Sequence, residues 1–85
     1  MTHTTDRQRL VLNALVGVRS MTLAELREVL GVGSREYAFP TMYSLRQRRW
    51  VLFFEDPAAE PGHRFRYALT PTGKAQALML QPVSA

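Results

Sequence analysis

The chain has 85 residues with a net charge of +4, and 46% of them are hydrophobic. This composition suits one small packed domain over residues 1–85 and argues against disorder. Because cysteine is absent, disulfides, thiolate metal sites and cysteine nucleophiles are excluded. No apolar run approaches the ~20 residues that span a bilayer, and the first residues lack a signal peptide's basic and apolar stretches. We therefore expect a soluble cytoplasmic protein that does not associate with membranes.

A first helix is predicted over residues 5–18. Thr5 and Gln8 have the spacing of a capping box, in which two side chains bind the free backbone N–H groups of the first turn. Apolar residues recur at helical spacing and cover a second side of this helix as well. They are Leu10, Val11, Leu12, Ala14, Leu15, Val16 and Val18. A helix that is apolar on two sides is typically sandwiched between neighbours, here its own core and a partner chain.

A second, short helix is predicted over residues 22–30. Thr22 and Glu25 repeat the capping-box spacing. Gly31 is well placed for the left-handed residue that commonly ends a helix.

A turn over residues 31–36 leads to a third helix, predicted over residues 36–48. Pro40 has no N–H, so it fits best near the first turn, where that donor lacks a partner within the helix. Helical geometry then turns one face to the core and another to solvent. The expected inward residues are Phe39, Met42 and Leu45, and the outward ones are Tyr37, Thr41, Ser44, Gln47 and Arg48. Tyr43 would lie between the faces, with Arg46 and Arg49 toward the protein.

Two strands and a last helix follow. Residues 50–55 are β-branched and aromatic, and residues 63–70 alternate between apolar and polar side chains, which predicts a hairpin around the turn-rich loop 56–62. A short helix is predicted over residues 71–80. The order of elements indicates an α+β, mostly α, fold of the winged helix-turn-helix type. It has three helices, a two-stranded β-hairpin wing and a short C-terminal helix.

Two segments resemble the PadR family of winged-helix transcriptional repressors. Residues 39–51, Phe-Pro-Thr-Met-Tyr-Ser-Leu-Arg-Gln-Arg-Arg-Trp-Val, are similar to the recognition helix and first wing strand of that family. Residues 64–73, Arg-Phe-Arg-Tyr-Ala-Leu-Thr-Pro-Thr-Gly, are similar to its second wing strand and the entry to its last helix. One departure is Arg49, which stands where the family usually has glycine, so this turn must adopt another conformation or carry strain.

The resemblance implies a homodimer that binds double-stranded DNA, with the third helix in the major groove. This chain would dimerise through its N-terminal and C-terminal helices, as its small size without a disulfide or metal also suggests. Arginine and glutamine read base edges, whereas serine, threonine and tyrosine mostly contact phosphate. The candidate DNA-binding residues are Arg35, Tyr37, Thr41, Tyr43, Ser44, Gln47 and Arg48 on or before the helix, and Arg64 and Arg66 on the second wing strand. Each of these side chains could equally lie on an ordinary solvated surface.

The wing loop does not fit DNA binding along its whole length. Glu55, Asp56 and Glu60 precede any basic residue in it, and carboxylates are repelled by phosphate. We therefore expect the wing tip to stay off DNA, with any contact coming from arginines at the base of the wing. Trp50 is expected in the core beside the hairpin.

No constellation of residues predicts catalysis, a metal site or a cofactor. His3 and His63 have no ligand-type neighbours at metal spacing, and there is no nucleophile–base grouping or glycine-rich phosphate loop. The main hypothesis is a sequence-specific DNA-binding transcriptional repressor that is not an enzyme. Two alternatives stay open: a winged-helix module for protein–protein interaction, and an architectural or replication-associated DNA binder without sequence preference.

Overall fold

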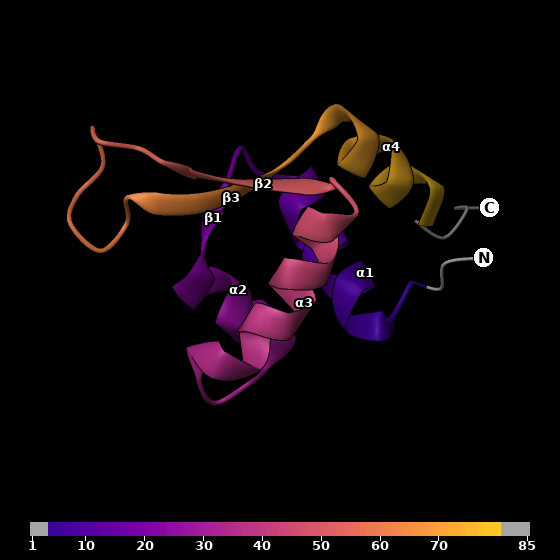
Figure 1. Ribbon diagram of the computed structural model, residues 1–85, viewed down its shortest axis with the longest axis horizontal. Coiled ribbons are helices and arrows are strands. Elements are labelled where there is room, and N and C mark those ends of the chain that lie inside the picture. The colour runs from indigo at the N-terminus through magenta and orange to yellow at the C-terminus, as the bar shows by residue number, and fades with distance from the viewer. Residues whose placement is uncertain (1–3, 81–85) are drawn as a thin grey trace.

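The computed structural model describes residues 4–80 of the chain. Four helices and a three-stranded sheet follow one another along the sequence (Figure 1). They are α1 (Asp6–Val16), β1 (Met21–Thr22), α2 (Leu23–Leu30), α3 (Arg35–Gln47), β2 (Val51–Glu55), β3 (Phe65–Leu69) and α4 (Pro71–Leu80). The predicted α+β winged helix-turn-helix fold is confirmed. The hairpin formed by β2, the loop 56–64 and β3 is called the wing below, and it projects from the helical body.

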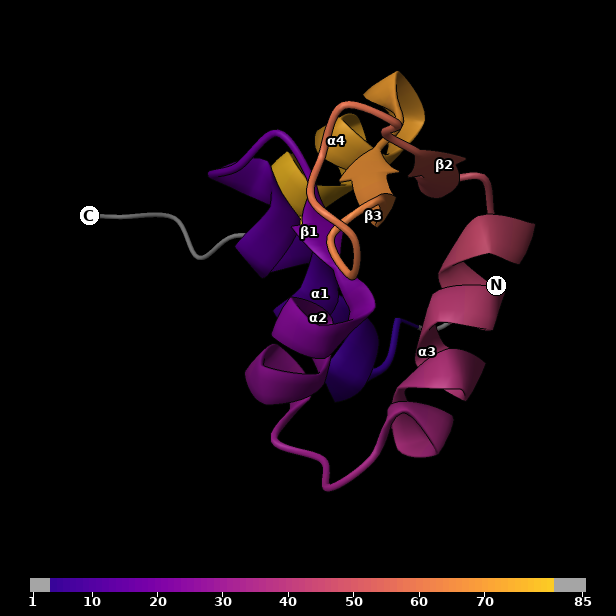
Figure 2. The same cartoon turned by 90° about the vertical axis from the view of Figure 1, so that its left-hand side faces the viewer.

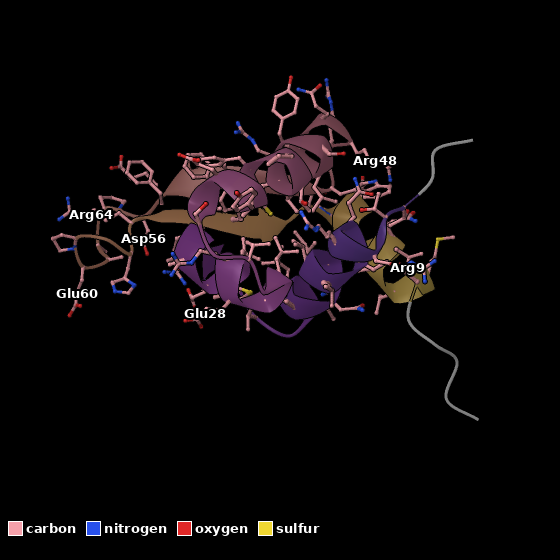
Figure 3. All side chains as sticks on the ribbon, turned by 90° about the horizontal axis from the view of Figure 1, so that it is seen from below. Arg9, Glu28, Arg48, Asp56, Glu60 and Arg64 are labelled. Atoms are coloured by element: carbon pink, nitrogen blue, oxygen red, sulfur yellow. The ribbon has the colours of Figure 1, made fainter. Side chains whose placement is uncertain are left out.

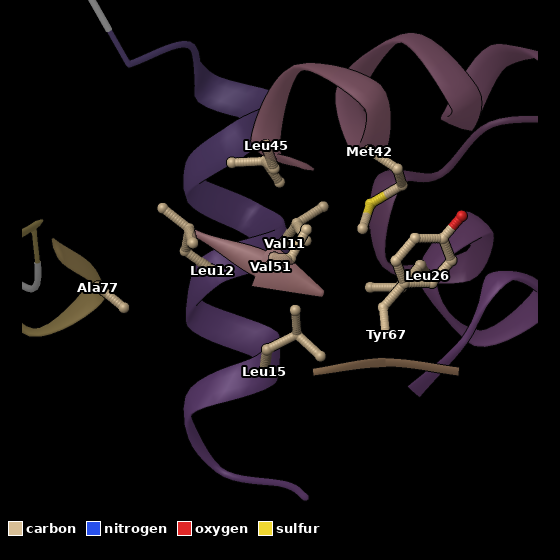
Figure 4. Packing of buried hydrophobic residues seen from close by; sticks show 9 residues of the cluster. All are labelled: Val11, Leu12, Leu15, Leu26, Met42, Leu45, Val51, Tyr67 and Ala77. Carbon is tan, nitrogen blue, oxygen red and sulfur yellow. The ribbon is translucent and has the colours of Figure 1, made fainter. Parts of the chain in front are cut away.

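The core lies around α1, which packs against the other three helices and β3. Its buried side chains come from every layer of the fold (Figure 4). They are Val11, Leu12, Leu15, Leu26, Met42, Leu45, Val51, Tyr67 and Ala77. The two apolar sides predicted for the first helix are therefore largely used within this one chain. Trp50 is half-buried and packs against the same cluster, as expected.

The sheet has one strand more than the predicted hairpin. β1 pairs with β3 in antiparallel fashion, with Met21 opposite Tyr67 and Thr22 opposite Arg66, so the strand order is β1-β3-β2. Two residues are too few to show the alternation from which a strand is predicted. The same Thr22 also caps α2, so the short strand joins the helical body to the wing.

The face of α3 that packs on the core differs from the prediction. Ala38, Met42 and Leu45 are buried, whereas Phe39 is 49% exposed. Pro40 lies inside the helix rather than in its first turn, because α3 already begins at Arg35. With Ala38 in the buried position next to it, Phe39 lies on an exposed side of the helix.

Arg49 holds a left-handed backbone conformation at the end of α3, with a φ of 61°. Its N–H donates to the carbonyl of Arg46 and the next N–H, from Trp50, donates to the carbonyl of Leu45. This pair of bonds is the Schellman motif, which usually places glycine at the left-handed residue. The turn has thus kept the conformation that glycine would favour, and Arg49 carries the strain.

We predict that Arg49→Gly stabilises the domain. Glycine adopts positive φ without the clash of a Cβ atom, although it loses more chain entropy on folding. The expected gain is about 1 kcal/mol, which raises the melting temperature of a domain this size by about 5 °C. Thermal unfolding followed by circular dichroism measures it. Arg49→Ala is the control, because it removes the same charge and keeps the strain, and an equal gain in both variants would contradict this account.

The first turn of α4 packs against Arg49 and Trp50, the two residues that precede β2. Thr70 donates its backbone N–H to the carbonyl of Trp50 and its hydroxyl to the carbonyl of Arg49. The hydroxyl oxygen of Thr70 also accepts a hydrogen bond from the backbone N–H of Gly73, with 2.9 Å between the two atoms. Thr70 thereby caps the N-terminus of α4. Gly73 is buried, and its backbone lies directly against the Trp50 carbonyl. This contact locks α3, β2 and α4 together.

Both predicted capping boxes are present, and the second one affects a titration. Glu25 accepts hydrogen bonds from the backbone N–H and the hydroxyl of Thr22, each at 3.0 Å. The backbone hydrogen bond, with help from the hydroxyl and the charge of Arg66, holds the pKa of Glu25 below its ordinary value despite partial desolvation. A carboxyl with a lowered pKa in the folded state stabilises the fold above its unfolded pKa. That contribution is lost as the pH falls through the folded value.

We predict that Glu25→Gln lowers the melting temperature near pH ~7 and that this difference shrinks towards acidic pH, as the carboxyl becomes protonated in the parent chain as well. Thermal unfolding across this range measures the effect. Glu28→Gln, an exposed position on the same helix, serves as the control. A difference between parent and Glu25→Gln that stays constant over the whole range would show that the charge of Glu25 is not the cause.

Candidate nucleic-acid interface

The outer side of α3 is open to solvent. Figure 2 shows α3 at one edge of the molecule, with α1 and α2 both on its inner side. Tyr37 and Tyr43 are each 63% exposed, and Gln47 is exposed one turn further along. Tyr37 and Gln47, predicted to point outward, and Tyr43, predicted to lie between the faces, are therefore all within reach of a large ligand.

Two arginines that the sequence placed toward the protein belong to this surface instead. Arg46 and Arg49 are exposed, and together with Tyr43 and Gln47 they line a hollow at the C-terminal end of α3. The guanidinium of Arg46 lies 5.5 Å from the ring centroid of Phe53 on β2, which orients it. The arginine-rich end of the helix was the sequence signal for this cluster. Because Phe39 was assigned to the core, the predicted outward face of α3 was rotated away from these arginines.

Three other predicted contacts are used inside the fold. Thr41 is only 8% exposed, so the prediction that it points outward is wrong. Ser44 is half-buried and accepts a 2.7 Å hydrogen bond from the amide of Gln8 on α1. Arg48 lies with its guanidinium 4.5 Å from the Trp50 ring centroid, and it donates to the hydroxyl of Thr4. The hydrogen bond of Ser44 joins α3 to α1, and Arg48 contacts residues that lie just before α1 and just before β2.

The wing arginines are also tied to the protein. Arg66 donates to the hydroxyl and carbonyl of Ser20 and forms an ion pair with Glu25 at 3.8 Å. Arg64 is exposed and donates to the carbonyl of Ala59, so it belongs to the outer part of the wing rather than to its base. Arg35 begins α3, and its side chain lies outside the described part of the structure.

The carboxylates of the wing loop lie far from Arg48 at the C-terminal end of α3. Figure 3 places Arg9 and Arg48 at one end and Arg64, Asp56 and Glu60 at the other, on the wing loop. The acidic wing tip predicted from the sequence is thus far from the basic end of α3. Within residues 4–80, no group of three or more His, Asp or Glu side chains is placed to hold a metal ion. None of the described helices combines the length and the apolar character needed to cross a membrane.

These features define a winged-helix domain with an exposed, arginine-flanked third helix. No protein-family model and no curated protein matches the sequence. Solved structures do match the fold. The MarR family transcriptional regulator SPO1453 from Silicibacter pomeroyi has 23% sequence identity and a TM-score of 0.73, over 87% of this chain and 49% of that one.

Two further solved structures show the same likeness. MarR from E. coli in its reduced form has 25% identity and a TM-score of 0.75, over 88% of this chain and 53% of that one. A mutant MarR from E. coli complexed with operator DNA has 24% identity and a TM-score of 0.74, over 88% and 51%. This chain spans about half the length of these proteins. The comparison confirms the winged-helix fold.

Proposed function

We propose that this protein is a DNA-binding transcription regulator that places α3 in the major groove of double-stranded DNA. The observation that carries the proposal is the exposed cluster of Tyr43, Arg46, Gln47 and Arg49 at the C-terminal end of α3. Arginine and glutamine are the residues that most often read base edges bidentately, and arginine also neutralises phosphate. A MarR structure of the same fold contains operator DNA, which supports the assignment.

The proposal includes a homodimer that acts as a repressor. α1 and α4 pack against each other, and they expose Leu10, Leu78 and Met79 to solvent. Exposed apolar side chains of this size on two adjacent helices favour association with a second copy. Two recognition helices related by a two-fold axis would lie ~34 Å apart, so the operator would be an inverted repeat. Kinship with the PadR family rests on the sequence segments 39–51 and 64–73.

The test is selection from a pool of random duplex DNA followed by sequencing of the retained fraction. Enrichment of one inverted repeat supports a dimeric, sequence-specific regulator and identifies its operator. Retention without enrichment points to an architectural binder. No retention at ~50 mM salt, where phosphate contacts are strong, overturns the DNA assignment.

A further inference from the structure

The wing carries an apolar face that extends beyond the core. In the register of β2 and β3, Val51 lies opposite Leu69, Phe53 opposite Tyr67, and Glu55 opposite Phe65. Paired residues of antiparallel strands share one face, so these side chains form a single strip. Its inner end is buried, with Val51 and Tyr67 in the core, but Phe53 is 41% and Phe65 57% exposed.

This strip forms one wall of an open groove against the helices. The groove is lined by Leu23 and Ala24 of α2, Phe39 of α3, and Phe53, Phe65 and Tyr67 of the wing. The exposure of Phe39, which the sequence assigned to the core, is explained by this position in the groove wall. Three partly exposed phenylalanines around one hollow are a larger apolar feature than single scattered surface residues, and such features mark sites of association.

The aromatic rings of the groove are held in place before any partner arrives. Phe53 and Phe65 stack with their ring centroids 5.6 Å apart and their planes 9° from parallel, and Phe53 also contacts Tyr67 at 4.9 Å. Fixed aromatic anchors bind at a low cost in side-chain entropy and dominate the energy of many protein interfaces.

The charge beside the groove selects the kind of partner. Residues 55–64 carry three carboxylates and one guanidinium on a chain that is otherwise strongly basic. Within residues 4–80, Glu55 and Glu60 have no ion-pair partner, and Glu55 lies on the same face as the exposed phenylalanines. Arg46 stands at the inner end, over Phe53. Carboxylates at the outer end repel nucleic-acid phosphate and attract cationic groups.

We propose that this groove, which adjoins the α3 surface proposed to bind DNA at Arg46, is a docking site for a basic protein segment with apolar anchors. The anchors enter among Phe39, Phe53 and Phe65, and lysine or arginine side chains of the partner meet Glu55 and Glu60. Such a site would let the DNA-bound regulator recruit a second protein through the part of the wing that DNA repels. It gives the acidic loop a role that DNA binding does not.

The test uses two synthetic amphipathic helical peptides of about 14 residues, with identical leucines and either lysine or glutamate elsewhere. Each is titrated into the isotope-labelled full chain, and amide chemical shifts are followed by NMR. The lysine peptide should shift the amides of Leu23, Phe39 and Phe65, and it should bind about tenfold more tightly than the glutamate peptide.

Variants separate the two parts of the proposal. Phe65→Ser should weaken the binding of the lysine peptide by about tenfold. Leu52→Ser, at an exposed apolar position on the opposite face of β2, should leave it unchanged. The double variant Glu55→Lys with Glu60→Lys should reverse the preference between the peptides. Since these side chains are exposed, the variants should keep the fold. Phe65→Ser should also still bind the duplex selected above, which shows that a loss of peptide binding is independent of DNA binding.

Three results would overturn the proposal. Peptide shifts confined to α4 would place binding elsewhere. A single-stranded oligothymidylate that displaces the lysine peptide from the groove would make it a nucleic-acid site. Shifts at Phe53 and Phe65 that depend only on protein concentration would make a second copy of the chain the occupant.

Discussion

Gly73→Ala should destabilise the domain by about 3 kcal/mol, because the new methyl group has no space. A Cβ atom at Gly73 would lie 1.8 Å from the carbonyl oxygen of Trp50 and 2.6 Å from its carbonyl carbon. Both atoms belong to the backbone, so no side-chain rotation relieves the overlap. Either α4 or the start of β2 must move, and the hydrogen bonds from Thr70 to the carbonyls of Arg49 and Trp50 weaken with it.

Thermal and urea unfolding measure this loss, which corresponds to a fall of about 15 °C in melting temperature for a domain this small. Gly17→Ala is the matched control. Its added Cβ meets no atom within 4 Å and its φ is −88°, so we expect a change within ~1 kcal/mol. Equal melting temperatures for the parent and Gly73→Ala would show that α4 is not seated on Trp50 as described.

Local features of the fold could be predicted from the sequence, because their partners lie within four residues. The capping boxes at Thr5 and Thr22 and the left-handed Gly31 all form as expected. The run ending in Gly73 was identified only by family resemblance. Its physical reason is the close approach to Trp50, which lies 23 positions away in the sequence. No local pattern carries that information.

The candidate site was predicted only in part, because it too depends on contacts between residues that are far apart in the sequence. Tyr37 and Gln47 are exposed as expected. The rotation of α3 depends on how Ala38 packs, and taking Phe39 instead of Ala38 as inward, beside Met42 and Leu45, turns the centre of the face by about 30°. That error exchanged the roles of Thr41 and Arg46. The partner of Arg66 was also beyond prediction, because Ser20 is separated from it by 46 positions and reaches it only when β1 joins the sheet.

The double variant Arg46→Ala with Gln47→Ala should raise the Kd for the selected operator about a hundredfold, or about 3 kcal/mol. Both side chains are exposed on the outer side of α3, so the loss should come from DNA contact rather than from unfolding. The single variants separate their roles. Arg46→Ala should reduce the slope of log affinity against log salt by about one if it neutralises a phosphate, and Gln47→Ala should relax the preference for one base pair in each half-site.

Fluorescence-anisotropy titrations with the operator and with scrambled duplex, at several salt concentrations, measure both effects. Arg19→Ala is the charge-matched control, because Arg19 is exposed beside Phe54 and Asp56, on the face of the wing that does not carry Phe53. It should change affinity only slightly, through the long-range field. If the double variant binds the operator as the parent does, α3 is not the recognition helix. If Arg19→Ala costs as much as Arg46→Ala, net charge rather than a placed contact holds the DNA.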